Sequence, residues 1–426
     1  QNSIHLALKN SLELKAQNYR LAAAKHSLGE ANSSKDWKNS FSTVFNSTNK
    51  DSNSNGFFGE DDTTTSTISI SKNIFDGGEA FEKHSIAEDT LKLQKASLIK
   101  VKQKIILEAI KAYLDVYSNQ SVVRLRKRSL KRFEENVEAT KLKLEAGTVT
   151  PTVLAEAQSK YAKAKYELIL AEGNLNNYTS KLKSITKLKN VPSDLKLPKL
   201  NFKIPKTVNK AVEVSLENNP IILVAKLEKD IAKKNVDLKK SNNRPSLKME
   251  FFGKDSQSSV NTSASDYQSY GANLTFSTPL FYNESTKDNI RRLDKLFIAT
   301  SFDLSEKNRQ VELNAISSYQ NYKSTLAKTS ASRSEKISSL LALNGIKKEA
   351  QFGIRTVLDV LDAEVEYLNA STNVIKSKAD EIYSQFHIKS ILGNLSIRDI
   401  NRDYKVNHDL KENSLNFKIL DPKAFN

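Results

Sequence analysis

The chain contains no cysteine, which excludes disulfide bonds, thiolate metal sites, a cysteine nucleophile and a lipid-modified N-terminal cysteine. It also has few of the residues that build ordinary cores and turns, with 12 Gly, 8 Pro, one Trp and one Met among its 426 residues. Hydrophobic residues make up 38%. This is thin for a globular core but typical of long helices with narrow apolar stripes.

Long hydrophobic runs are also missing. No stretch approaches the roughly 18–20 apolar residues that a membrane-spanning helix needs. Any contact with a bilayer is therefore expected to involve β-strands or the surface of the protein. No signal peptide is recognisable, and the chain begins at Gln1 inside an amphipathic pattern, as expected of a processed or trimmed chain.

The net charge is +17, from 66 Lys and Arg against 49 Asp and Glu. These cations are spread along the chain and lack the interleaved aromatic residues that stack on bases. The pattern favours solvated helix faces, and we expect no nucleic-acid partner.

No catalytic pattern is recognisable. The five His are scattered, and neither a Gly-rich phosphate loop nor a Ser-His-Asp arrangement is present. His84 and Glu88 share a predicted helix face, but one imidazole and one carboxylate do not make a zinc site. We therefore expect no enzyme activity, no cofactor and no metal.

An internal duplication is the strongest positive signal. The segment Leu107–Tyr113 (LEAIKAY) recurs as Leu313–Tyr319 (LNAISSY), an offset of 206 residues from 107 to 313, and Gly147 recurs as Gly353 at the same offset. A repeat in constant register indicates one structural unit used twice.

Each half is predicted to contain a helix, a β-hairpin, a long helix and a return helix. The first repeat, residues 1–206, comprises a helix at Ser3–Glu30, a hairpin at 37–75, a long helix at 78–146, a return helix at 152–187 and a linker at 190–206. The second, residues 207–400, comprises a helix at Val208–Lys240, a hairpin at 246–278, a long helix at 281–352 and a return helix at 356–392, followed by an extended tail at 401–426.

The long helices are expected to pack as coiled coils. No Gly or Pro occurs between Glu79 and Ala146, a span of roughly 100 Å at ~1.5 Å per residue if it is one helix. Apolar residues recur there at heptad spacing, which favours left-handed packing against partner helices. They are Leu91, Leu98, Ile105, Ala112, Val116, Val123, Leu130, Val137 and Leu144.

In the hairpin regions, apolar residues recur at every second position, whereas in the long helices they recur at every seventh. Phe41 and Phe45 alternate with polar residues, as do Leu274 and Phe276, so each strand has one apolar and one polar face. Strands of about 9–10 residues, suited to a tilted membrane strand, are expected around polar loops at 46–62 and 253–266. Four such strands leave two edges and an apolar face open, so several chains together would be needed to close a barrel in lipid.

This order of elements, repeated twice, resembles the TolC-type outer-membrane channels of efflux and type I secretion. The most specific match is Gly353–Ala363 (GIRTVLDVLDA), which is similar to the family signature Gly-x-Arg-Thr-x-x-Asp-Val-Leu-Asp-Ala. Ile74–Gly78, Thr278–Phe281 and Ile388–Gly393 add support. The fold class that the resemblance implies is mainly α with a small β part. Four strands per chain would form a trimeric twelve-stranded outer-membrane β-barrel, continued by a twelve-helix periplasmic α-barrel.

The resemblance also implies a function and partners. The chain would be an exit duct in the outer membrane of a Gram-negative bacterium, with a large periplasmic part. It would work as a homotrimer in outer-membrane lipid, with a periplasmic adaptor (membrane fusion) protein and an inner-membrane ABC or proton-driven transporter.

Two aspartates of the signature are the candidate pore constriction. Asp359 and Asp362 share one helix face, and in a trimer each position becomes a ring of three carboxylates. The resemblance places such aspartates at the periplasmic aperture. Glu156, which corresponds to Asp362 in the first repeat, is expected to complete the ring. The alternative is that these acids simply favour a helix start through the helix dipole.

Arg355 matches an arginine that links neighbouring helices in the closed family members, and it is the candidate gate link. A solvated residue at the hairpin tip is the alternative. The chain departs from the family pattern at Ala350, where a gating tyrosine is usual, and at Val153, where an acidic partner is usual. The closed state is therefore expected to be held differently.

The turns between long and return helices are the candidate adaptor contacts, at Gly147, Thr148, Gly353 and Ile354. Glycine suits the left-handed residue beyond a helix end, so plain tight turns are the alternative. For the whole chain, the competing hypothesis is a soluble coiled-coil structural or membrane-surface scaffold protein, which explains the heptads but not the paired amphipathic strands.

Overall fold

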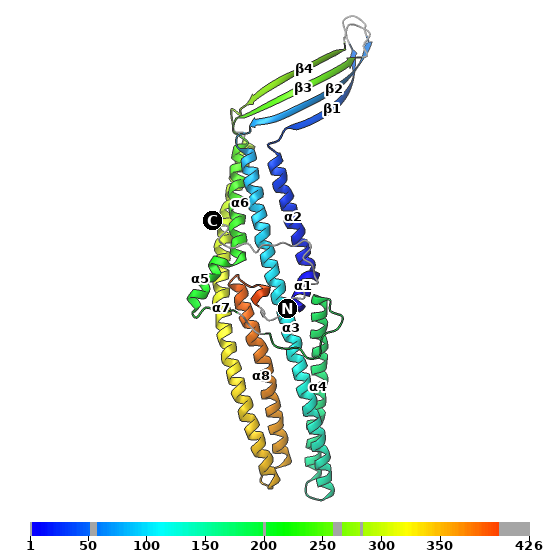
Figure 1. Cartoon of the computed structure of the whole chain (residues 1–426), viewed down its shortest axis with the longest axis vertical. Helices are drawn as coiled ribbons and strands as arrows, with labels where there is room; N and C mark the ends of the chain where they lie inside the picture. Colours follow the sequence, from blue (N-terminus) through cyan, green and yellow to red (C-terminus); the bar gives the residue numbers. More distant parts are fainter. Residues whose placement is uncertain (1, 52–57, 199–201, 259–265, 282–283, 400–426) are drawn as a thin grey trace. The chain divides into compact units, whose positions relative to one another are not determined.

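The computed structural model describes residues 2–51, 58–198, 202–258, 266–281 and 284–399 (Figure 1). Its helices are α1 (Asn2–Asn10), α2 (Leu12–Ser33), α3 (Glu79–Glu145), α4 (Pro151–Thr186), α5 (Val208–Asn218), α6 (Pro220–Ser241), α7 (Glu284–Gln351), α8 (Val357–Ile391) and the 3-10 helix η1 (Ile397–Asp399). Its strands are β1 (Lys38–Asp51), β2 (Phe58–Phe75), β3 (Ser246–Ser258) and β4 (Tyr267–Ser277). The tail predicted to be extended, 401–426, lies outside the described residues.

The long helices match in length, with 67 residues in α3 and 68 in α7, as do the return helices, with 36 residues in α4 and 35 in α8. The predicted heptad positions of α3 are buried or half-buried, and the buried ones are Leu98, Ile105, Ala112, Val116 and Val123. The heptad pattern predicted for this helix is therefore confirmed. Among the described helices, none is both long and apolar enough to span a bilayer.

The opening helices differ from the prediction, because each is two helices rather than one. Between α1 and α2, the Ser11 hydroxyl accepts a hydrogen bond from the Leu14 backbone N–H and starts a new helix. Between α5 and α6, Pro220 cannot donate a helical hydrogen bond and Asn219 adopts an extended conformation. The Asn219 side chain caps α6 by accepting from the Ile221 N–H.

The strands form one antiparallel sheet in the order β1-β2-β3-β4. They have 14, 18, 13 and 11 residues, so they are longer than predicted. Pairing continues into the segments expected to be loops, for instance between Ser47 and Asp62 and between Ser256 and Tyr267. The reason is that backbone hydrogen bonds hold the ladder together, and polar side chains do not end it.

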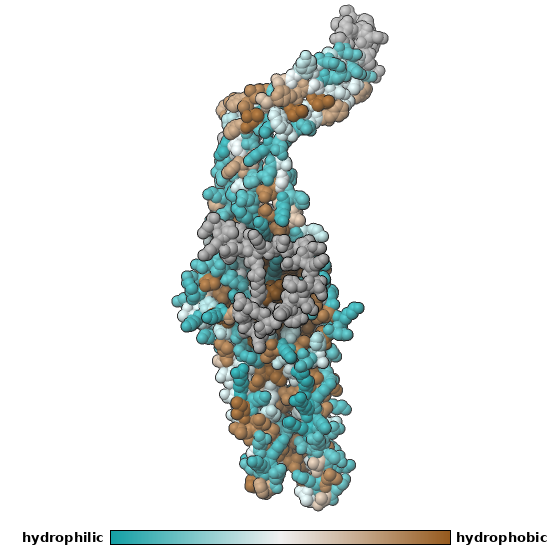
Figure 2. All heavy atoms as spheres, in the orientation of Figure 1, coloured by the Kyte–Doolittle hydropathy of each residue, from teal (hydrophilic) through white to brown (hydrophobic). Residues whose placement is uncertain are grey.

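The sheet has one apolar and one polar face. Residues opposite each other in the register share a face, which places Phe41 beside Ile68, Ile70 beside Phe251, and Met249 beside Leu274. Most of these side chains are exposed in the single chain. On the other face, hydroxyl pairs span the strands, as between Ser40 and Ser69 at 2.8 Å. Figure 2 shows the hydrophobic residues gathered near the strand-to-helix junctions of the sheet and hydrophilic ones toward the hairpin ends.

The chain divides into two compact units that cut across the duplicated halves. One unit contains residues 18–96 and 224–306, and therefore the whole sheet. The other contains residues 1–17, 97–223 and 307–426, and therefore α4, α8 and the adjoining parts of α3 and α7. All the candidate site residues belong to this second, helical unit.

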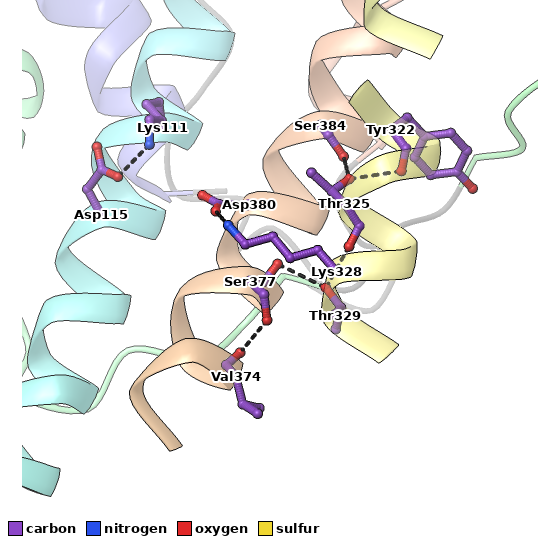
Figure 3. A network of polar contacts seen from close by, with 10 residues as sticks. All are labelled: Lys111, Asp115, Tyr322, Thr325, Lys328, Thr329, Val374, Ser377, Asp380 and Ser384. Carbon is purple, nitrogen blue, oxygen red and sulfur yellow. Dashed lines mark hydrogen bonds and ion pairs between the residues drawn. The ribbon is translucent and has the colours of Figure 1, made fainter. Parts of the chain in front are cut away.

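Both helical hairpins have buried apolar contacts, and the α7–α8 hairpin also has buried hydroxyl groups between its helices. The α3–α4 pair is joined by apolar clusters, such as Val122, Val123, Leu168 and Ala171. The α7–α8 pair uses buried hydroxyl groups, with Thr325 Oγ1 lying 2.8 Å from Ser384 Oγ and Thr329 Oγ1 donating to the Ser377 carbonyl at 3.1 Å (Figure 3).

Candidate functional site

The two tip turns, at 146–150 and 352–356, have the same backbone geometry. Gly147 and Gly353 have φ values of +73° and +78°, the left-handed conformation that glycine adopts without strain. The N–H of the next residue bonds back into the long helix in both, from Thr148 to the Lys143 carbonyl and from Ile354 to the Glu349 carbonyl. The predicted glycine turns are therefore present in both repeats. Thr148 and Ile354 are both solvent-accessible, and the Ile354 residue is 71% exposed.

Asp359 occupies the start of α8. Its carboxylate accepts hydrogen bonds at 2.9 Å from both the backbone N–H and the hydroxyl of Thr356, while the Thr356 hydroxyl accepts from the Asp359 N–H at 3.1 Å. This reciprocal arrangement is a capping box. The Thr356 N–H, then the Thr356 hydroxyl and the nearby Arg355 charge hold the pKa of Asp359 below its ordinary value. The alternative explanation for Asp359, that an acid at this position favours a helix start, is thus consistent with a contact that the side chain makes.

The equivalent position in the first repeat cannot make this cap. Val153 stands where Asp359 stands in the second repeat, and the N-cap residue of α4, Thr150, makes no side-chain cap bond. The two tips therefore share a turn but not the helix start that follows it. Because Val153 has no carboxylate, the start of α4 lacks the capping box that is present at the start of α8.

Arg355 is bound within its own hairpin. Its Nε donates to Glu349 Oε2 at 2.9 Å, and this bond with the Glu349 charge raises the pKa of the guanidinium. Both side chains are about half exposed, at 50% and 45%. The pair closes the turn between α7 and α8 and does not reach the α3–α4 hairpin.

Asp362, in contrast, joins the two hairpins. Its carboxylate forms an ion pair with Lys160 of α4, although 64% of the Asp362 side chain remains exposed. Glu156 lies on α4 one turn before Lys160 and is exposed. The structure therefore brings Asp362 to the part of α4 that carries Glu156.

A carboxylate that the sequence reasoning missed lies two residues further along α8. Glu364 is 1% exposed. Its Oε1 accepts from Arg132 Nη1 of α3 at 2.7 Å, and its Oε2 lies 3.0 Å from Lys347 Nζ of α7. We call Arg132, Lys347 and Glu364 the Glu364 triad.

A sequence signal for Glu364 existed. It lies three residues after Leu361 and four before Leu368, hence on the apolar stripe of α8 rather than on the face of Asp359 and Asp362. An acid on an apolar stripe is rarely left unpaired. Two members of the triad are close in sequence to an apolar cluster in which Phe133, Ala157 and Leu361 from α3, α4 and α8 are all buried.

No metal site accompanies these acids. Within the part of the chain that the structure describes, no group of three or more His, Asp or Glu side chains is placed to hold an ion. The site consists of carboxylates, their cations and the tip turns.

Comparison with known proteins identifies the family. The model of the outer membrane efflux protein family matches residues 3–186 and 211–394, one match for each repeat. The chain is 25% identical over 360 residues to the outer membrane protein TolC of Vibrio cholerae, covering 82% of this chain and 81% of that protein. It is 22% identical over 419 residues to the alkaline protease secretion protein AprF of Pseudomonas aeruginosa, covering 93% and 84%.

Among solved structures, a crystal structure of CusC superposes with a TM-score of 0.82 at 13% identity, covering 92% of this chain and 91% of that chain. Duplicated helical hairpins, a four-stranded sheet and a family match over both repeats agree with one another. The chain belongs to the outer membrane efflux protein family, and it is an outer-membrane exit duct with a large periplasmic helical part.

Proposed function

We propose that three copies of this chain close into one channel that crosses the outer membrane. The observation that carries this proposal is the sheet. It has four strands, two unpaired edges in β1 and β4, and an exposed apolar face. Unpaired strand edges are not tolerated in lipid, and three such sheets joined edge to edge would remove all of them in a twelve-stranded barrel. The alternative, a soluble coiled-coil scaffold, does not explain the exposed apolar face or the unpaired strand edges.

We propose that the channel is a passive duct in a three-part assembly. An inner-membrane transporter, either ABC-type or proton-driven, would supply the driving force, and a periplasmic adaptor would connect it to the duct. The exposed tips around Gly147, Thr148, Gly353 and Ile354 are the surfaces offered to the adaptor. The duct itself would carry out no chemical reaction.

The constriction is assigned to acidic side chains of the helical unit. We propose that Asp359, Asp362 and Glu156 from three chains form a negative ring that favours cations, and that movement of the hairpins widens it. Support comes from the ion pair between Asp362 and Lys160, which connects the acidic segment of α8 to α4. Arg355 would contribute by stabilising the tip turn through Glu349.

The test is ion conduction by the purified protein in planar bilayers. The double variant Asp359→Ala/Asp362→Ala should change the single-channel conductance and weaken the cation preference, because six carboxylates per trimer are removed. Thr356→Ala is the matched control, since it removes the capping hydroxyl but keeps both carboxylates. An unchanged reversal potential in the double variant would show that the ring lies elsewhere.

A further inference from the structure

We infer that Glu364 is the positioning residue that keeps the α7–α8 hairpin against the α3–α4 hairpin, so that the constriction stays closed until the triad separates. This inference rests on the proposed channel function and adds to it the residue that holds the closed state. It concerns a side chain outside the Asp359–Asp362 face and outside the tip turns.

The first support is that the Glu364 triad connects three helices through one buried group. Glu364 belongs to α8, Arg132 to α3 and Lys347 to α7. The Glu364 side chain is 2% exposed, whereas those of Arg132 and Lys347 are 49% and 42% exposed. The two cations therefore cover the carboxylate from the surface, and the carboxylate has no access to water in this arrangement.

Burial makes this link energetically different from the others. A buried carboxylate loses its hydration, and it is tolerated only while cations and hydrogen bonds compensate it. Oε1 has a hydrogen bond from Arg132, but Oε2 has no hydrogen-bond donor among the described residues and is compensated by the Lys347 charge alone. Removing the carboxylate would leave the two cations without the negative charge that they share.

The other polar links near the tips are weaker candidates. Near the tip turns, two ion pairs between described residues join one hairpin to the other, Arg132–Glu364 and Lys160–Asp362. The carboxylate of the second pair is largely exposed. Exposed pairs contribute little to stability. Arg355 is paired within its own hairpin, and Ala350 and Val153 have no polar side-chain atoms with which to form a link.

The chemistry of the triad also suits a contact that must open. When the hairpins separate, water can hydrate Glu364, Arg132 and Lys347, which offsets much of the lost attraction. Separating apolar side chains has no such compensation, because exposing them to water is unfavourable. The ionic contact is therefore easier to separate than the apolar cluster of Phe133, Ala157 and Leu361, which also joins the two hairpins.

Two variants test this inference in opposite directions. Glu364→Gln removes the negative charge that both cations share, so we expect the fraction of time spent open in planar bilayers to rise at least about tenfold. Glu366→Gln is the matched control, since it removes an exposed carboxylate two residues away on the same helix and should behave as wild type. The triple variant Arg132→Met/Lys347→Met/Glu364→Leu replaces the ions with apolar groups and should open less often than wild type.

A distance measurement keeps the inference separate from the channel proposal. Because the chain has no cysteine, spin labels can be placed at Thr148→Cys and Ile354→Cys alone, in trimers diluted with unlabelled chain. The distance between the tips within one chain should lengthen in Glu364→Gln and stay short in the control and in the triple variant. This distance measurement does not require conduction. An absence of conduction in the wild type would therefore overturn the channel proposal but would leave the inference about Glu364 testable.

The outcomes that contradict the inference are equally definite. Wild-type distances and open times in Glu364→Gln would show that the triad does not hold the hairpins. If Glu364→Gln does not assemble, Arg132→Gln takes its place, because the Arg132 side chain is 49% exposed and its substitution leaves Glu364 without its hydrogen bond. An unchanged distance between the tips in that variant would show that the triad does not hold the hairpins.

Discussion

At the residue scale, four neighbouring acids of α8 have four different roles. Asp359 caps its own helix, Asp362 pairs with Lys160, Glu364 is buried between two cations, and Glu366 is exposed. The spacing of three and four residues separates Asp359, Asp362 and Glu366 from the apolar stripe that contains Leu361 and Leu368. It could not reveal which helix each acid would meet, since that depends on the neighbours.

The capping box leads to a pH prediction. The folded-state pKa of Asp359 is lowered, so its contribution to stability is present above the unfolded carboxyl pKa of about 3.9 and is lost as pH falls through the lower folded value. We expect the first turn of α8 to exchange its amide hydrogens faster under acidic conditions, after correction for intrinsic rates. Hydrogen-exchange mass spectrometry at pH 6 and at pH 3 measures this.

Thr356→Ala tests the same contact at neutral pH. Loss of the N-cap hydroxyl should destabilise the start of α8 by about 1 kcal/mol and move the pKa of Asp359 back toward its ordinary value. Thr150→Ala is the matched control, because Thr150 makes no side-chain cap bond at the start of α4. Equal exchange in both variants would show that the capping box does not stabilise the helix.

At the scale of elements, local rules explain most of the helices and strands. Heptad spacing predicted the long helices, alternation predicted the strands, and glycine predicted the turns at Gly147 and Gly353. The breaks at Ser11 and Asn219 were missed, since capping side chains there outweigh a helical pattern that continues on both sides. Strand ends were also missed, because pairing extends beyond the apolar residues.

Packing between the hairpins can be tested at Leu361. This side chain is 0% exposed and packs in one cluster with Phe133 of α3 and Ala157 of α4. Leu361→Ala should destabilise the folded protein by about 2–5 kcal/mol, since it removes buried methyl groups and leaves a cavity. Thermal unfolding in detergent measures the change. Leu142→Ala, at a residue 58% exposed on α3, should have a much smaller effect, and equal losses would place Leu361 outside the core.

At the scale of the whole molecule, the single chain leaves large apolar surfaces without a partner. Phe41, Phe45, Leu274 and Phe276 are each more than 60% exposed on the sheet. Patches of this kind on soluble monomers are rare and mark contact with lipid or with other chains. We therefore expect the apolar face of the sheet to contact lipid and the helical unit to contact neighbouring helices.

This leads to a prediction about extraction and assembly. The protein should require detergent for extraction from membranes and should then have the mass of a trimer in native mass spectrometry, because β1 and β4 need partners from other chains. A monomer that is stable in plain buffer, with its sheet residues in coil by circular dichroism, would contradict both the barrel and the trimer.

The sequence by itself determined the elements, their duplication and the family, because periodicity, turn residues and the signature at Gly353–Ala363 are all local properties of the chain. Only the tertiary structure decided what surrounds each side chain. Burial of Glu364 arises where α3, α7 and α8 meet, and the cation of α3 that compensates it lies 232 residues away in sequence, at Arg132. Electrostatic compensation depends on distance in space, which no spacing along the chain records.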